Sequence, residues 1–139
     1  MTDNFERAIA FVLKWEGGYV NDPKDPGGET KYGISKRAHP TLDIKSLTEA
    51  QAKEIYRTDY WQAANCHVLE WPLCLVVFDT AVNMGAARAQ ELRSKAFNWT
   101  DYIFLRIEHY NRIAANGKNI EFLRGWLNRV IDLWRTGKT

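Results

Sequence analysis

WEGGYVNDPKDPGGETKYGI, residues 15–34, is the stretch that decides the fold of this chain. Its five glycines and two prolines interrupt regular backbone hydrogen bonding, so it cannot form a helix and predicts turns, with room for a short hairpin. A hydrophobic core has no need of a loop so rich in glycine, proline and acidic residues. Because loops of this composition on a rigid scaffold commonly carry function, we expect the site of the protein here.

Helical patterns flank this insert on both sides. Before it, residues 3–16 place apolar side chains at 3.6-residue spacing, and Asp3 with Glu6 predicts a capping box. After it, the segment that follows Pro72 is apolar nearly all round, which is typical of a buried central helix. Other helices are predicted over residues 48–60, 86–96, 101–115 and 120–134, with a brief one at 35–39. The fold class is therefore mainly α, with a loop-rich or short β-hairpin insert after the first helix.

The length and composition of the chain are those of an ordinary globular protein. Its 139 residues suit one domain with one core. Nineteen basic and 17 acidic residues leave a net charge of +2, which argues against a nucleic-acid partner. No run approaches about 18 apolar residues, so we expect no stable membrane insertion. The charged residues Asp3, Glu6 and Arg7 argue against a signal peptide and favour synthesis in the cytoplasm.

Several polar residues outside the insert receive structural interpretations. Cys66 and Cys74 do not make a disulfide framework and are expected to be reduced thiols in the fold. The three histidines lack the spacing of a metal site, so we expect no metal. Asp79 and Asn83, one helical turn apart, either bind sugar amides or tie helices together. The basic residues of the C-terminal half are interpreted as solvated helix faces: Arg88, Arg93, Lys95, Arg106, Arg112, Arg124, Arg129 and Arg135.

Four carboxylates lie within fourteen residues of the insert, at Glu16, Asp22, Asp25 and Glu29. Glycoside hydrolysis requires such a set, because one carboxylic acid protonates the leaving oxygen while a second group stabilises the cation or activates water. Glu16 suits the acid, since it ends a helix whose dipole opposes ionisation there. Asp22 and Asp25 lie in a turn open to water and are expected to stay ionised.

The insert and the segments around it resemble the signature of glycoside hydrolase family 108, the N-acetylmuramidases of phages and bacteria. The resemblance runs in order along nearly the whole chain, through EGGY (16–19), NDP (21–23), DPGGETKYGI (25–34), LT (47–48), IYRTDYW (55–61), FDTAVNMG (78–85) and FLRGWLNR (122–129). It implies a lysozyme-like fold and one catalytic domain over residues 1–139. The C-terminal part is shorter than is usual in the family, and the helices from about 72 to 139 are expected to complete the fold.

The resemblance also implies roles for individual residues. The glutamate of the Glu-Gly-Gly motif is the catalytic acid of the family, which corresponds to Glu16. Phage-type lysozymes place an aspartate nine residues later and a threonine shortly after it, which correspond to Asp25 and Thr30. Asp22 and Glu29 remain alternatives for the second catalytic role. Candidate sugar contacts are the aromatic and amide side chains of Trp15, Tyr19, Tyr32, Trp61 and Asn83.

The predicted reaction is hydrolysis of the β-1,4 bond between N-acetylmuramic acid and N-acetylglucosamine, without a cofactor. The expected partner is the peptidoglycan glycan strand, and we expect a monomer. The family suggests a phage endolysin that lyses the host, made in the bacterial cytoplasm and released to the cell wall through a holin-like pore. A lytic transglycosylase, a non-catalytic wall-binding protein and a nucleic-acid-binding helical domain are the alternatives.

Overall fold

The computed structural model describes residues 3–24 and 27–139 of the chain. The helices are α1 (Asn4–Glu16), α2 (Glu49–Tyr56), α3 (Leu73–Met84), α4 (Ala86–Lys95), α5 (Trp99–Ile113) and α6 (Ile120–Gly137). Shorter helical segments are the π-helix η1 (Arg57–Gln62) and the 3-10 turns η2 (Cys66–Val68) and η3 (Ala115–Gly117). Two short strands, β1 (Thr30–Lys31) and β2 (Ile34–Ser35), follow α1. The mainly α, lysozyme-like fold class that the sequence predicts is confirmed.

The longer predicted helices are observed, and their starting signals are partly as expected. Thr48 and Gln51 form a reciprocal capping box that starts α2. Asp3 caps α1 by accepting a hydrogen bond from the amide of Phe5 (3.2 Å), but the predicted partner Glu6 instead pairs with Lys53 on α2. The capping box expected at α1 is therefore wrong in its second half, because a cation on a neighbouring helix competes for the carboxylate.

The insert forms a hairpin rather than turns alone. Thr30 pairs with Ser35, and a two-residue turn at Tyr32 and Gly33 has positive φ at both positions, 53° and 80°. This geometry matches the right-handed twist of the strands and suits a glycine at the second position. The brief helix predicted over 35–39 is wrong, because Ser35 pairs in the ladder and the residues after it continue as turns.

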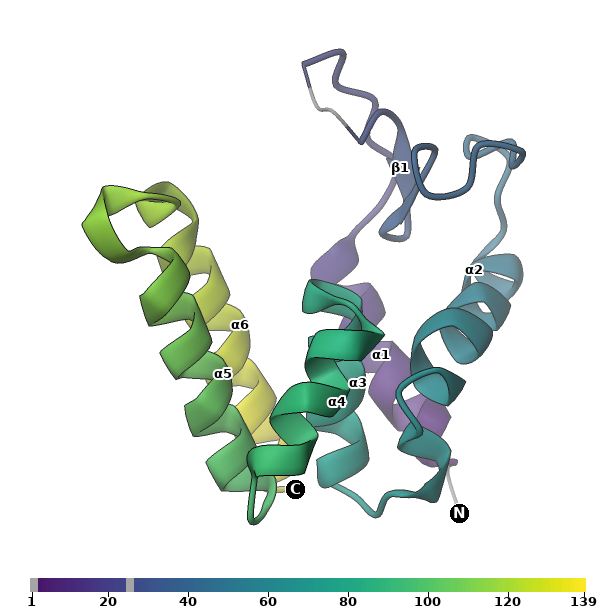
Figure 1. Ribbon diagram of the computed structural model, residues 1–139. Helices are drawn as coiled ribbons and strands as arrows, with labels where there is room; N and C mark the ends of the chain where they lie inside the picture. The colour runs from purple at the N-terminus through teal and green to yellow at the C-terminus, as the bar shows by residue number, and fades with distance from the viewer. Residues whose placement is uncertain (1–2, 25–26) are drawn as a thin grey trace.

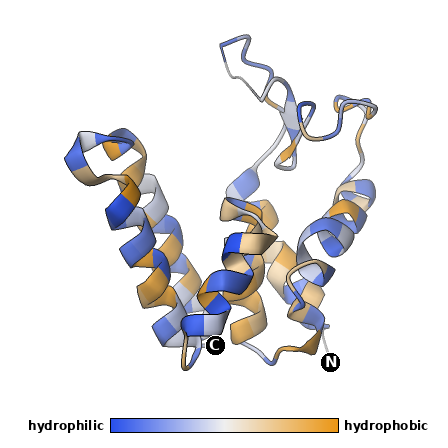
Figure 2. Cartoon of the chain, in the orientation of Figure 1, coloured by the Kyte–Doolittle hydropathy of each residue, from blue (hydrophilic) through white to orange (hydrophobic). Residues whose placement is uncertain are grey.

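Helix α3 forms the centre of the molecule, with α1, α4, α5 and α6 packed around it (Figure 1). Figure 2 shows apolar residues gathered on α3 and on the neighbouring parts of α1, as predicted for a buried central helix. Cys66 and Cys74 are free thiols in this core, and burial raises the pKa of Cys74 to about 11. Both cysteines are therefore unreactive residues of the core, as predicted.

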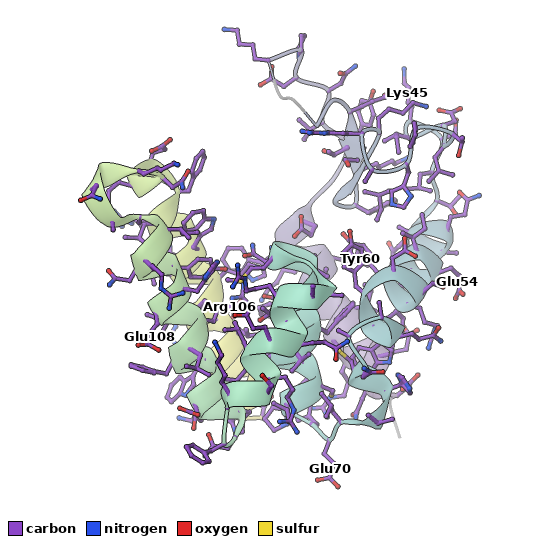
Figure 3. The ribbon with its side chains drawn as sticks, viewed as in Figure 1. Lys45, Glu54, Tyr60, Glu70, Arg106 and Glu108 are labelled. Atoms are coloured by element: carbon purple, nitrogen blue, oxygen red, sulfur yellow. The ribbon has the colours of Figure 1, made fainter. Side chains whose placement is uncertain are left out.

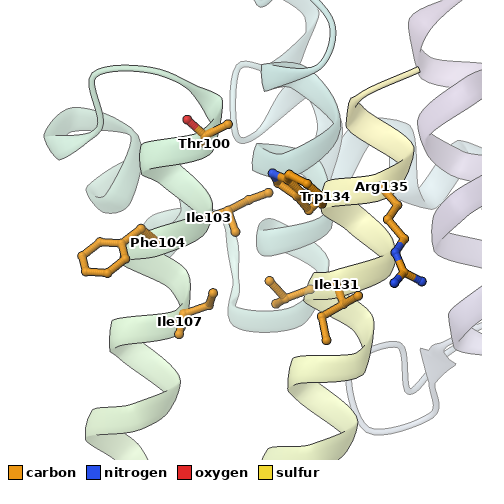
Figure 4. A pocket seen from close by; sticks show the side chains of 8 residues that line it. Thr100, Ile103, Phe104, Ile107, Ile131, Trp134 and Arg135 are labelled. Atoms are coloured by element: carbon orange, nitrogen blue, oxygen red, sulfur yellow. The ribbon is translucent and has the colours of Figure 1, made fainter.

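Helices α5 and α6 lie side by side as a pair on one side of α3 (Figure 1). Their seam carries an apolar pocket of about 430 Å³ (Figure 4). Its lining residues are Thr100, Ile103, Phe104, Ile107, Val130, Ile131, Trp134 and Arg135. This lining holds no carboxylate, so the pocket lacks the groups needed for acid catalysis. Within residues 3–24 and 27–139, no helix has the length and apolar character needed to cross a bilayer.

Candidate active site

Glu16 is the last residue of α1, where the helix meets the insert. Gly17 follows with φ of 73° and turns the chain out of the helix. The Glu16 side chain is 25% exposed, so its carboxyl is accessible while much of its surface is covered by protein. On its covered side, Arg129 Nη1 of α6 donates a hydrogen bond to Glu16 Oε1 (2.8 Å). The helix end therefore presents one half-buried carboxyl with a fixed cationic partner.

The hairpin turn packs directly against the Glu16 side chain. Gly33 has no room for a side chain, since an added Cβ would lie 2.9 Å from both Cβ and Cγ of Glu16 and would also meet the Tyr56 hydroxyl. That hydroxyl donates a hydrogen bond to the Tyr32 carbonyl (2.6 Å), which ties the turn to α2. Burial raises the pKa of Tyr56, so this phenol stays protonated as a donor. The turn is thus clamped between α1 and α2.

We expect Gly33→Ala to lower both stability and activity. The positive φ costs about 1–3 kcal/mol for a residue with a side chain, and the new methyl group displaces Glu16 or Tyr56. Gly28→Ala is the matched control, because Gly28 has a similar φ of 72° while its nearest neighbour would be Lys36 Cβ at 3.9 Å. Chemical denaturation and hydrolysis rates compare the two variants. Equal activities would show that the contact of Gly33 with Glu16 has no functional importance.

Behind Glu16 lies a buried network of charged side chains. Asp79 of α3 is fully buried, and Arg129 donates to its Oδ1 through Nη2 (2.7 Å) and Nε (3.1 Å). Arg106 of α5, also fully buried, donates through Nη1 to Asp79 Oδ2 (2.8 Å). Burial alone would raise the pKa of Asp79, but attraction to the two guanidinium groups outweighs it and lowers that pKa. Asp79 is therefore an ionised carboxylate that joins α3, α5 and α6.

The interpretation of Arg106 and Arg129 as solvated residues is wrong. Both are buried, and Figure 3 shows Arg106 pointing from α5 toward the central helices while Glu108 lies on the outer side. The sequence contains a signal that these arginines are buried. Arg106 continues the apolar spacing of Ile103 and Tyr110, and a carboxylate in the apolar helix α3 requires buried cations. The alternative in which Asp79 ties helices together is the one observed.

The predicted sugar contacts lie in different environments. Trp61 is 5% exposed and packs edge-on against Phe5 and Phe78, so it belongs to the core and offers no face to a sugar. Trp15 is 37% exposed and donates its indole N–H to Asp132 of α6 (2.8 Å). Asn83 accepts a hydrogen bond from the Tyr110 hydroxyl (2.6 Å). Trp15 and Asn83 thus have surface that is accessible to a ligand, and each is also held by a hydrogen bond to another helix.

The described candidate residues of the insert are held by hydrogen bonds within the insert itself. Tyr19 donates to Glu29 Oε2 (2.6 Å), and this hydrogen bond raises the pKa of Tyr19. Thr30 is paired through its backbone with Val20, in both directions at 2.8 Å. Asp22 accepts from the amide of Lys24 (2.9 Å), which is typical of a residue that forms a turn. The prediction for Asp25 falls outside the described residues.

This arrangement can perform general acid chemistry at one carboxyl. Glu16 is accessible, is held in one orientation by Arg129, and lies against the turn of the hairpin that carries Thr30. General acid catalysis requires such a positioned group within reach of a leaving atom. Among the residues that the structure describes, no group of three or more His, Cys, Asp or Glu could hold a metal ion.

Comparison with known proteins finds one matching family model and a similar solved structure. Residues 9–85 match the family model of Glycosyl hydrolase 108, a range that includes the end of α1 with Glu16, the insert, α2 and α3. The structure of SagA from Brucella abortus is similar over 95% of this chain and 92% of that chain, with a TM-score of 0.78 and 26% sequence identity. No curated protein sequence matches the chain.

Proposed function

The chain belongs to the glycosyl hydrolase 108 family and is a glycoside hydrolase, and on this premise we propose that it hydrolyses the β-1,4 bond between N-acetylmuramic acid and N-acetylglucosamine in peptidoglycan. The observation that carries the proposal is the environment of Glu16. It is an accessible carboxyl at the end of α1, oriented by Arg129 and packed against the turn of the insert. The family membership supports a peptidoglycan substrate.

In the proposed reaction, Glu16 donates its proton to the glycosidic oxygen as the bond to the anomeric carbon breaks. Asp25 stabilises the cation that develops or directs the attacking water, and Thr30 helps to hold that water. Trp15, Tyr19, Tyr32 and Asn83 are the proposed sugar contacts. The two carboxyl roles are those required of any glycosidase that uses a pair of acidic residues.

Digestion of purified peptidoglycan, with the products analysed by mass spectrometry, tests this reaction. We expect muropeptides that end in hydrated, reducing muramic acid. Anhydro ends would show a lytic transglycosylase, and reducing glucosamine ends would show a glucosaminidase. If folded protein binds the polymer and releases no product, a non-catalytic role in binding or assembling the wall replaces the proposal. The anomeric form of the first product also reports the separation of the two carboxyl groups.

The wider setting belongs to the same proposal. We propose that residues 1–139 form one catalytic domain, in which the helices from about 72 to 139 complete the fold. The protein would act as a monomer on glycan strands of the cell wall, without a cofactor. Lysis of a bacterial host at the end of phage growth, with release through a holin-like pore, is the proposed biological role.

A further inference from the structure

Arg129 is held from two sides by carboxylates on different helices. Its Nη1 donates to Glu16 of α1, while its Nε and Nη2 donate to Asp79 of α3. The guanidinium group is planar and rigid, so both carboxylates must match the directions of its N–H bonds. The side chain is 9% exposed, which leaves it little room to swing away. Arg129 therefore links the carboxyl of Glu16 to Asp79, which serves as its buried anchor.

The anchor is fixed by further contacts on its other side. Asp79 Oδ2 accepts from Arg106 Nη1, and the same nitrogen lies 3.1 Å from Thr80 Oγ1. Arg106 Nε donates to the Tyr110 hydroxyl (3.1 Å), whose proton is donated to Asn83. Each oxygen of Asp79 thus has an arginine partner, so the carboxylate cannot rotate without breaking an ion pair. A buried pair of this kind is costly to disrupt.

The two oxygens of Glu16 are not equivalent in this arrangement. Oε1 accepts the hydrogen bond from Arg129. Oε2 accepts no hydrogen bond from any residue that the structure describes. A proton on Oε1 would point at the N–H group of Arg129, which cannot accept a hydrogen bond. The contact therefore leaves Oε2 as the oxygen that carries a transferable proton.

Charge complementarity also supports the contact. Arg106, Arg129 and Asp79 together carry one excess positive charge, and Glu16 is the second acidic partner of Arg129. From α2 and η1, the described groups that also interact with Glu16 are the phenols of Tyr56 and Tyr60. Burial raises the pKa of both phenols, and nearby carboxylates including Glu16 add to the rise, so both are neutral. Arg129 is thus the charged partner of Glu16 in this arrangement.

We infer that Arg129, anchored by Asp79, is a positioning residue that directs Oε2 of Glu16 toward the glycosidic oxygen. This inference rests on the proposed function. The contact with Arg129 and Asp79 gives the proton on Oε2 one fixed direction of transfer.

Substitution of Arg129, followed by measurement of kcat and KM, tests the inference. We expect Arg129→Met to lower the kcat for hydrolysis of purified peptidoglycan by about tenfold or more, because the carboxyl is no longer oriented. KM should change little, because the contact positions the acid and not the substrate. Arg129→Lys keeps the charge but loses the planar fork that fits two carboxylates, so its kcat should also fall. Arg124→Met, on an exposed arginine of the same helix, is the matched control.

A purely structural role would lower stability without a selective loss of kcat, so a folded Arg129→Met protein with the kcat of the wild type would overturn the inference. If Arg129→Met does not fold, Arg129→Gln provides the neutral side chain, and the same loss of kcat is required of it. The ¹³C resonance of the Glu16 carboxyl, compared between wild type and the Arg129 variant at one pH, reports the contact without catalysis. A changed resonance in a protein that releases no product would refute the proposed function and leave the contact standing. An unchanged resonance would refute the inference.

Discussion

Glu16→Gln should lower the rate of muropeptide release by about 10²- to 10⁴-fold, the range that a positioned general acid contributes. Glutamine has the shape of glutamate and keeps a carbonyl oxygen that can accept from Arg129 Nη1, so the side chain should hold its position. Only the transferable proton is removed. Product release from peptidoglycan and the thermal midpoint of unfolding are the two measurements.

Two matched variants make this result specific. Glu29→Gln removes a carboxylate of the same insert that bonds Tyr19, and should keep most of the activity unless Glu29 has the second catalytic role. Asp25→Asn and Asp22→Asn then compare the other candidates for that role. Full activity of folded Glu16→Gln would exclude Glu16 as the acid and would remove the basis of the proposed mechanism.

The sequence predicts the fold well because its signals are local. The apolar period, the Thr48 and Gln51 capping box and the density of glycine in the insert each specify structure over a few residues. The errors arise where distant residues compete with a local preference. Lys53 takes the carboxylate of Glu6 from its predicted cap, and pairing with Thr30 draws Ser35 into a strand.

The sequence predicts only part of the candidate site, for the same reason. Glu16 is marked by the glycines that follow it, whereas its partner Arg129 lies 113 residues away in the chain. Trp61 resembles a sugar contact by residue type, yet the packing of Phe5 and Phe78 places it in the core. Contacts of this kind depend on how helices pack, and the spacing of residues along one helix does not specify them.

Asp79→Asn should be the most destabilising substitution of a charged residue considered for this fold. Removing one partner of a buried ion pair costs about 3–5 kcal/mol, because the remaining charges stay buried without compensation. Here the loss leaves Arg106 and Arg129 facing each other across a neutral amide. Urea denaturation at neutral pH measures the free energy of unfolding. Asp59→Asn is the control, since this half-exposed carboxylate should contribute less than about 1 kcal/mol.

The same variant should also change how stability depends on acid. The pKa of Asp79 is lowered in the folded protein, so its stabilising contribution is complete above the ordinary carboxyl pKa of 3.8 and is lost as pH falls through the lowered value. Wild-type protein should therefore lose stability below about pH 4, and Asp79→Asn should lose less over the same range. Parallel stability curves for the two proteins would mean that Asp79 is not ionised in the fold. Because Arg129 joins Asp79 to Glu16, loss of this anchor should lower hydrolysis even at temperatures where the variant is fully folded.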